Sequence, residues 1–204
     1  MPKITVPTAP IPVQMAYAVP SGSVRTASAR KTTLTTIAAT VNAVIRGFVK
    51  PSVYFSHAHF PVRALGHGRR VGLWLQGCSI RCAGCIVPQT WTAGPQHLVP
   101  VGDLVARLTP WLERCDGVTI SGGEPFDQPE ALRHLLPALR HVVRGDIWAY
   151  SGHPWSHVSR YPELLAWLDG VITEPFRADL PSAHPYIGSS NQEWHGLTPL
   201  GETR

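Results

Sequence analysis

Three cysteines crowded into the stretch Cys78–Cys85 constrain this chain more than any other feature. Their spacing is C-x-x-x-C-x-x-C, with Cys82 in the middle. Thiolates this close in sequence can surround one iron–sulfur cubane, with each sulfur on a different iron. Because such clusters usually take four thiolates, a set of three leaves one iron open to a small molecule. The spacing therefore predicts a [4Fe–4S] cluster with a vacant coordination position.

The same cysteines also fit two other kinds of site. A Cys₃His zinc site, as in a non-catalytic zinc-binding module that docks other molecules, would recruit a nearby histidine. The candidates for that fourth ligand are His57, His59, His67 and His97. Three unligated thiols in a buried loop are the second alternative.

The surroundings of the cysteines favour a metal centre in a reducing compartment. No acidic residue precedes Asp103, and Arg81 lies inside the loop, so positive charge is expected to favour thiolates and offset a cluster's negative charge. A secreted disulfide framework would spread its cysteines along the chain, whereas these are crowded together. The crowding therefore predicts a cytoplasmic protein. Cys115 stands apart at the end of an expected helix and is interpreted as a small buried residue.

From residue 53 onward, strand and helix patterns alternate, which predicts an α/β fold with a mostly parallel sheet. Helices are expected at residues 101–114, where Pro110 should kink or shorten the helix, and at residues 127–140, with Asp127 as N-cap and Glu130 completing a capping box. Residues 155–168 are expected to be largely helical, with an interruption near Pro162. Strands are expected at residues 70–76, 117–120, 146–150 and 170–174, and residues 60–65 are expected to form a hairpin with the first of them. Four strands are enough for a partial, open β/α barrel.

Cofactors in such sheets bind at the carboxyl ends of the strands, where the distinctive residues of this chain fall. Glu124 follows the second strand and offers negative charge to an ammonium group. The whole turn there is Ser121, Gly122, Gly123, Glu124 and Pro125, and its glycines allow close backbone approach to a ligand. Ser151 and Gly152 follow the third strand, where contact with a ligand and plain turn formation are equally open. Trp74 and Trp91 flank the cysteines, either as core residues or as a shield against water.

Residues 1–52 differ from the rest of the chain. They are rich in Ala, Thr, Val, Pro and Ser, and they lack acids. This composition predicts a low-complexity, disordered extension that precedes a domain at residues 53–204. Arginine and serine without acids also fit a transit peptide.

At this point the residues resemble a known family, the radical S-adenosylmethionine activating enzymes. The segment Gln76–Cys85, followed by Gln89-Thr90-Trp91, is similar to the small activase of anaerobic ribonucleotide reductase and to pyruvate formate-lyase activating enzymes. The turn Ser121–Pro125 resembles the family's methionine-binding motif. Residues 150–152 and 188–192, the latter including Asn191, resemble further segments of the small activases.

The resemblance implies a radical SAM enzyme with a partial β/α barrel. Its cofactors would be a [4Fe–4S] cluster on Cys78, Cys82 and Cys85 and S-adenosylmethionine at the open iron. Reductive cleavage would give a 5′-deoxyadenosyl radical, which removes a hydrogen atom from a glycine of a partner glycyl radical enzyme. The cofactor-binding residues it implies are Ser121, Gly122, Gly123, Glu124, Pro125, Ser151, Gly152 and Asn191. Modification of a peptide or small metabolite by the same chemistry is the alternative.

The chain departs from the family pattern in places that a partner or substrate would contact. Residues 170–176 resemble a strand ending in Asp-Gly-Pro-Phe but lack the Asp-Gly. His153 replaces an expected aromatic residue, and Gly84 precedes the third cysteine, as in the small activases.

Charge and hydropathy limit the partners. The formal net charge is +5, yet basic residues never gather beyond adjacent pairs and are not interleaved with aromatics, so no nucleic-acid partner is expected. No apolar run is long enough for a membrane span, so no membrane partner is expected. The family implies a flavodoxin or ferredoxin as electron donor, and such acidic proteins are expected to dock on Arg69, Arg70 and Arg81.

Overall fold

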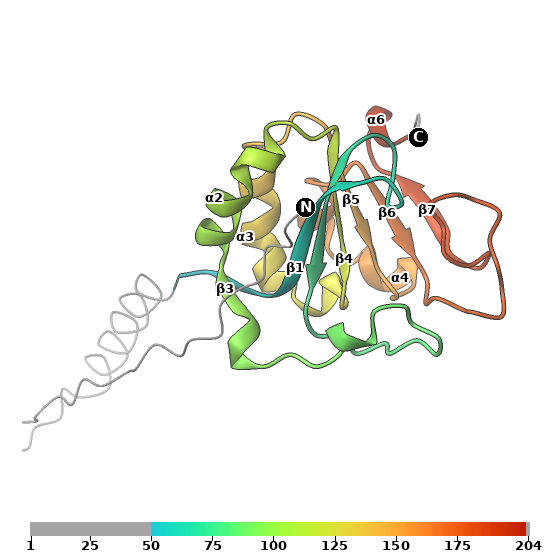
Figure 1. Ribbon diagram of the computed structural model, residues 1–204. Coiled ribbons are helices and arrows are strands. Elements are labelled where there is room, and N and C mark those ends of the chain that lie inside the picture. The colour runs from blue at the N-terminus through green and yellow to red at the C-terminus, as the bar shows by residue number, and fades with distance from the viewer. Residues whose placement is uncertain (1–49, 203–204) are drawn as a thin grey trace, which may run out of the picture. The chain divides into compact units, whose positions relative to one another are not determined.

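The computed structural model describes residues 50–202, which form a mixed α/β fold around one sheet (Figure 1). The expected α/β class with parallel strands is confirmed. Residues 1–49 of the predicted extension over residues 1–52, and with them the predicted transit peptide, lie outside the described residues. The last residue of the predicted extension, Ser52, is the first residue of a strand.

The sheet has seven strands in the order β3-β1-β2-β4-β5-β6-β7. They are β1 (Ser52–Val62), β2 (Arg70–Leu75), β3 (Leu98–Pro100), β4 (Gly117–Gly122), β5 (Asp146–Tyr150), β6 (Gly170–Thr173) and β7 (Glu193–Gly196). The four predicted strands are β2, β4, β5 and β6, and they pair in parallel. They are almost wholly buried, as expected for parallel strands covered on both faces.

The outer strands pair antiparallel to this parallel core. The predicted hairpin between β1 and β2 is confirmed, although β1 begins at Ser52 rather than near Phe60. A register shift between Phe55 and His57 interrupts its alternation of buried and partly buried residues. The tail after Pro175, predicted as loop, contains β7, a short edge strand against β6. Its side chains are only partly buried, so the sequence has no hydrophobic pattern there from which a strand could be predicted.

Two helices of matching length lie side by side on the sheet (Figure 1). They are α2 (Val101–Leu112) and α3 (Pro129–Arg140), and each buries leucines at helical spacing in the hydrophobic core. The predicted interruption of the helical segment 155–168 near Pro162 is confirmed, since the segment forms two short helices, α4 (Trp155–Val158) and α5 (Pro162–Leu165). Within residues 50–202 the remaining helices are α6 (Pro199–Glu202) and the 3₁₀ turns η1 (Pro88–Thr90), η2 (Pro95–His97) and η3 (Pro125–Asp127). No helix in the described part of the chain has the length and apolarity that crossing a bilayer requires.

The predicted capping box on α3 is wrong. The N-cap is Gln128, and Asp127 instead belongs to η3. The Asp127 carboxylate accepts hydrogen bonds from the backbone amide and the hydroxyl of Ser79, at 2.7 and 2.9 Å. Glu130 pairs with Arg133 at the surface. Asp127 therefore ties η3 to the cysteine loop rather than beginning a helix.

A fully buried ion pair joins the amino ends of the central strands. Arg70 at the start of β2 donates to Asp146 of β5 at 2.5 Å, and both side chains have no exposed surface. The guanidinium also donates to the hydroxyl of Thr119 and the carbonyl of Val118, and it lies 4.3 Å from the ring centre of Trp148. Because every contact lies within the fold, this arginine is structural.

We predict that Arg70→Met destabilises the protein by about 3–5 kcal/mol, because it leaves Asp146 buried without its cation. Urea unfolding followed by circular dichroism measures the effect. Arg177→Met is the control, since Arg177 pairs with Asp179 in full contact with water. Equal stability of Arg70→Met and wild type would contradict a structural role for the pair.

Candidate functional site

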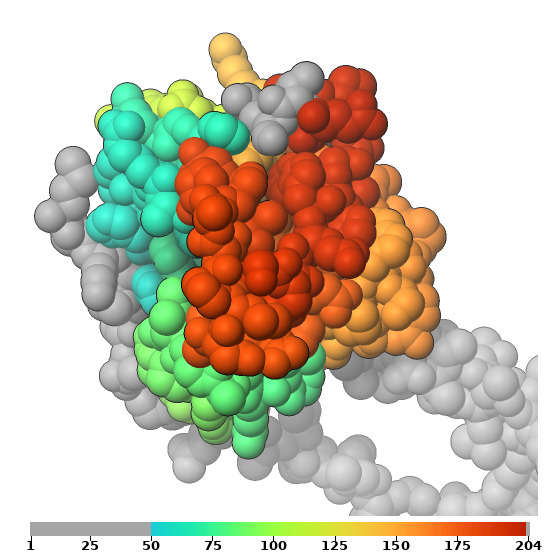
Figure 2. Space-filling view, turned by 90° about the vertical axis from the view of Figure 1, so that its right-hand side faces the viewer, coloured from blue at the N-terminus to red at the C-terminus, as the bar shows by residue number. Residues whose placement is uncertain are grey.

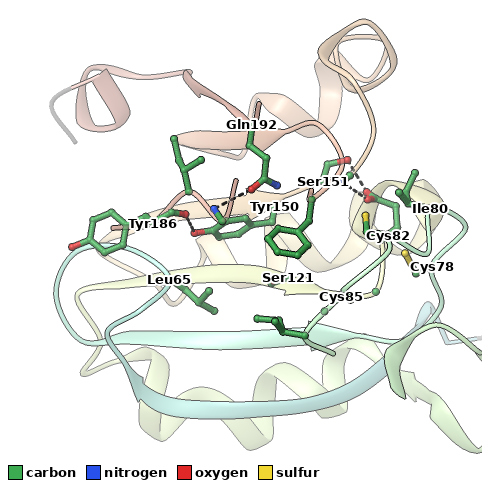
Figure 3. Close-up of a pocket in the computed structure, with 18 of the residues that line it drawn as sticks. Leu65, Cys78, Ile80, Cys82, Cys85, Ser121, Tyr150, Ser151, Tyr186 and Gln192 are labelled. Carbon is green, nitrogen blue, oxygen red and sulfur yellow. Dashed lines mark hydrogen bonds between the residues drawn. The ribbon is translucent and has the colours of Figure 1, made fainter. Parts of the chain in front are cut away.

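A cavity of about 330 Å³ opens where β2, β4 and β5 end (Figure 3). Cys78, Cys82 and Cys85 all line it, and so do residues 121–124 and 150–152. The structure thus brings together three predicted motifs that lie far apart in the sequence. Of the predicted site residues within the described part, Pro125 and Asn191 are absent from the lining.

The cysteine loop is closed by bonds between its two ends. The amides of Gly77 and Cys78 donate to the carbonyls of Thr90 and Trp91, at 2.7 and 3.0 Å. The Gln76 side chain donates to the carbonyls of Gln89 and Thr92, both at 2.8 Å. Since Gln76 follows β2 directly, the rigid sheet fixes where the loop begins and where it returns.

The thiols sit in a partly desolvated environment. Burial raises the pKa of Cys78, and the backbone amides of Arg81 and Ile80 oppose that rise. Burial likewise raises the pKa of Cys82, opposed by the amide of Phe176. Thiols of this kind ionise readily only when a positive group, such as an iron centre, binds them. Cys115 lies outside the cavity lining and packs, partly buried, against the hydrophobic core. Its thiol donates a hydrogen bond to the carbonyl of Leu112.

The donor set fits a multi-iron cluster better than a single ion. Within residues 50–202, no three His, Cys, Asp or Glu side chains converge on one metal position. A cubane does not need such convergence, because each thiolate binds a separate iron. None of the four histidines proposed as zinc ligands lines the cavity; His97, for example, accepts from the amide of Gly94. This arrangement argues against the zinc alternative.

A buried donor without a hydrogen-bond partner also belongs to a residue of the cavity lining. The indole Nε1 of Trp91 is buried and has no hydrogen-bond partner among the described residues, and Trp91 lines the cavity. A sulfur-rich group between the cysteines would provide acceptors for it.

The glycine pair approaches the chain's own backbone. Gly122 has φ +99°, and a Cβ on Gly123 would lie 2.0 Å from the carbonyl oxygen of Gly77. Two hydrogen bonds hold this contact: the Gly123 amide donates to the carbonyl of Leu75 at 2.9 Å, and the Glu124 amide donates to the carbonyl of Gly77 at 2.7 Å. The pair therefore joins the end of β4 to the start of the cysteine loop, in addition to lining the cavity.

Glu124 is 1% exposed and links two strand ends. Its Oε1 accepts from the Ser151 hydroxyl at 2.8 Å and from the Phe126 amide at 2.9 Å. Its Oε2 accepts from the Gly152 amide at 2.6 Å. Burial raises the pKa of the carboxyl, and these donors oppose the rise. Glu124 is one of the residues that line the cavity, and its carboxylate clamps the end of β5 to β4.

His153 occupies the position where the family pattern has an aromatic residue. Its Nε2 lies 2.9 Å from Asp127 Oδ1, and its ring stacks on His157 with 3.9 Å between centres. Since Asp127 holds Ser79, His153 connects the end of β5 to the cysteine loop. The sequence signalled the departure at His153 but gave no sign of its partner.

Glu174 explains the second departure from the family pattern. It stands where that pattern has glycine, and its φ of +81° lies in the left-handed region that favours glycine. Its carbonyl accepts from Gln192 at 3.1 Å, and its carboxylate accepts from the Trp155 amide at 3.3 Å. Glu174 therefore adopts a backbone conformation that glycine would adopt more readily.

The segment after β6 closes the cavity opposite the cysteines (Figure 3). Gln192 is ordered, accepting from the amides of Gly188 and Ser189 at 3.0 and 3.1 Å. Asn191 donates to the carbonyl of Pro175 at 2.8 Å, outside the cavity. Sequence reasoning missed the apolar part of the lining, because nothing in the sequence relates it to the motifs. It includes Leu65, Ile86, Phe176, Tyr186 and Ile187.

The same segment packs beside the cysteine loop on the molecular surface, as Figure 2 shows for the orange-red and green regions. Residues 80–84 and 175–179 line a second groove there. Arg81 is exposed at this groove, whereas Arg70 is fully buried at the other end of β2. The expected basic face of Arg69, Arg70 and Arg81 is therefore wrong, because one member is inaccessible and β2 separates the others.

We predict that Glu124→Gln lowers the stability of the cofactor-free protein by about 1–3 kcal/mol, because the amide nitrogen would face the Gly152 amide with no acceptor between them. Chemical denaturation of the apoprotein measures this, with the exposed Glu130→Gln as control. An unchanged midpoint would show that Glu124 serves only a ligand.

Comparison with known proteins gives a consistent result. A family model described as a 4Fe-4S single cluster domain matches residues 64–195. The anaerobic ribonucleoside-triphosphate reductase-activating protein of Enterobacteria phage T4 is 29% identical over 132 residues, covering 62% of this chain and 83% of that protein. The protein of the same name from Haemophilus influenzae is 28% identical over 141 residues, covering 64% and 89%. The pyruvate formate-lyase-activating enzyme of Staphylococcus aureus is 39% identical over 80 residues, covering 37% and 32%. The predicted resemblance is confirmed.

Proposed function

Since the chain belongs to the family of 4Fe-4S single cluster domains, we propose that residues 53–204 form a radical SAM enzyme that generates a glycyl radical on a partner protein. The observation that carries the proposal is the shared cavity of the three cysteines and the glycine-rich turn. The relatives named as activating proteins support the choice of reaction. The open sheet fits a partial barrel of the radical SAM type.

Cys78, Cys82 and Cys85 would hold the cluster. When bound, a [4Fe–4S] cluster supplies a single electron for the reductive cleavage of S-adenosylmethionine. Residues 121–124 would receive the methionine part, with strand-end backbone groups and Glu124 facing its ammonium. Ser151 and Gly152 would border the carboxylate or ribose. For Pro125 and Asn191, which lie outside the cavity lining, a contribution would be indirect, through the backbone they support.

The apolar part of the cavity would receive the hydrogen donor. Leu65, Phe176 and Tyr186 line this part of the cavity and would limit the access of water, which would protect a reactive carbon radical from side reactions. The backbone of a glycine-containing loop is small enough to enter such a space. The relatives named as activating proteins favour the activase reaction over modification of a small metabolite. The activase reaction is therefore the function we propose, in the cytoplasm and with a flavodoxin or ferredoxin as electron donor.

The first test is the cluster itself. Full-length protein reconstituted without oxygen is expected to bind about four irons and four sulfides per chain. After reduction it is expected to cleave S-adenosylmethionine to 5′-deoxyadenosine, which chromatography detects. Alanine at Cys78, Cys82 or Cys85 is expected to abolish both properties, and Cys115→Ala is expected to keep them. A colourless zinc protein would overturn the proposal.

The second test identifies the hydrogen donor. Incubation with a candidate glycyl radical enzyme carrying deuterated glycine is expected to place deuterium in 5′-deoxyadenosine and to produce a glycyl radical signal in electron paramagnetic resonance. Cleavage that proceeds normally while deuterium comes only from a peptide or metabolite would support the alternative substrate class and refute the activase role.

A further inference from the structure

Trp91 holds the most informative unpaired group at the site. Its carbonyl accepts the amide of Cys78 at 3.0 Å, so this residue and the first cysteine are fixed to each other through the backbone. Its side chain lines the cavity, and its Nε1 is buried without a hydrogen-bond partner among the described residues. An indole N–H can only donate, and a buried donor without an acceptor costs free energy.

Burial of an indole nitrogen alone would not identify a ligand. Trp148 also has a buried Nε1 without a partner in the described part, but it packs against Trp194 and Arg70 and lies outside the cavity lining. Trp91 is the one of the two that borders space a ligand can occupy. The acceptors expected in that space are the sulfurs of the cysteines and of the group they hold.

We propose that the Trp91 indole N–H donates a hydrogen bond to a sulfur of the cysteine-bound [4Fe–4S] cluster, and that it thereby raises the reduction potential of the cluster. This inference rests on the proposed function. A donor aimed at sulfur stabilises the reduced form more than the oxidised form, because reduction adds negative charge. Trp91 is therefore a tuning residue that makes the cluster easier for its electron donor to reduce.

Trp74 provides a matched control. It also flanks the cysteine loop in sequence and is partly buried, but it stacks on His57 with 4.7 Å between ring centres and does not line the cavity. Phenylalanine at either position keeps an aromatic ring and removes only the N–H and part of the ring volume.

The experiment is a redox titration of the reconstituted full-length protein, followed by electron paramagnetic resonance of the reduced cluster. Trp91→Phe is expected to contain about tenfold less reduced cluster at a fixed donor potential, which corresponds to a shift of about 59 mV to lower potential for one electron. Trp74→Phe is expected to titrate like wild type. Protein with ¹⁵N-indole tryptophan is expected to show a hyperfine coupling to the reduced cluster that Trp91→Phe lacks.

The labelled wild-type protein keeps the proposal testable even if Trp91→Phe loses its cluster. Absence of any indole coupling in wild type overturns the proposal, and so does a Trp91→Phe potential equal to that of wild type. A coupling that appears only after S-adenosylmethionine is added assigns the donor to that ligand and also overturns it. If wild type binds no cluster at all, the proposed function fails as well, so the two failures are distinguishable by iron and sulfide content.

Discussion

The close contact between the ends of β2 and β4 is the constraint on which the site depends. Gly123 lies against the carbonyl of Gly77 so tightly that any side chain would collide with it. The two hydrogen bonds across this contact set the position of the glycine-rich turn relative to the first cysteine. Because both strands belong to a buried parallel sheet, their ends cannot shift independently. The relative placement of the predicted cluster ligands and the predicted methionine-binding turn follows from this contact.

Carboxylates extend that constraint to the next strand. Glu124 holds the turn after β5 through Ser151 and Gly152, and Asp127 holds the cysteine loop through Ser79. Both carboxylates accept hydrogen bonds from backbone amides, and hydrogen bonds to a charged acceptor are short and strong. The site is therefore organised before any cofactor binds. Under the proposed function, such preorganisation would place a radical at a defined distance from its target.

The departures from the family pattern have local physical explanations. Glu174 adopts the left-handed backbone that glycine would supply, and two hydrogen bonds compensate for the strain. At position 153, histidine replaces the aromatic residue of the family pattern, and its imidazole forms a hydrogen bond with Asp127. Neither change removes a residue from the cysteine loop or the glycine turn. Neither His153 nor Glu174 is part of the cavity lining.

The sequence by itself determined the four parallel strands, the three cysteines and the glycine-rich turn, because each depends on residues close together in the chain. Burial on both faces produces an apolar run, and close backbone approach requires glycine, so both are visible locally. Only the tertiary structure decided the partners of Asp127 and Glu124, the burial of Arg70 away from Arg81, and the exclusion of Asn191 from the cavity lining. These features depend on which distant segments meet, and a carboxylate or guanidinium looks the same in sequence whether it meets water, a backbone amide or a ligand. The apolar lining and the unpaired indole of Trp91 belong to the same class, since a cavity is a property of the packed chain rather than of any one segment.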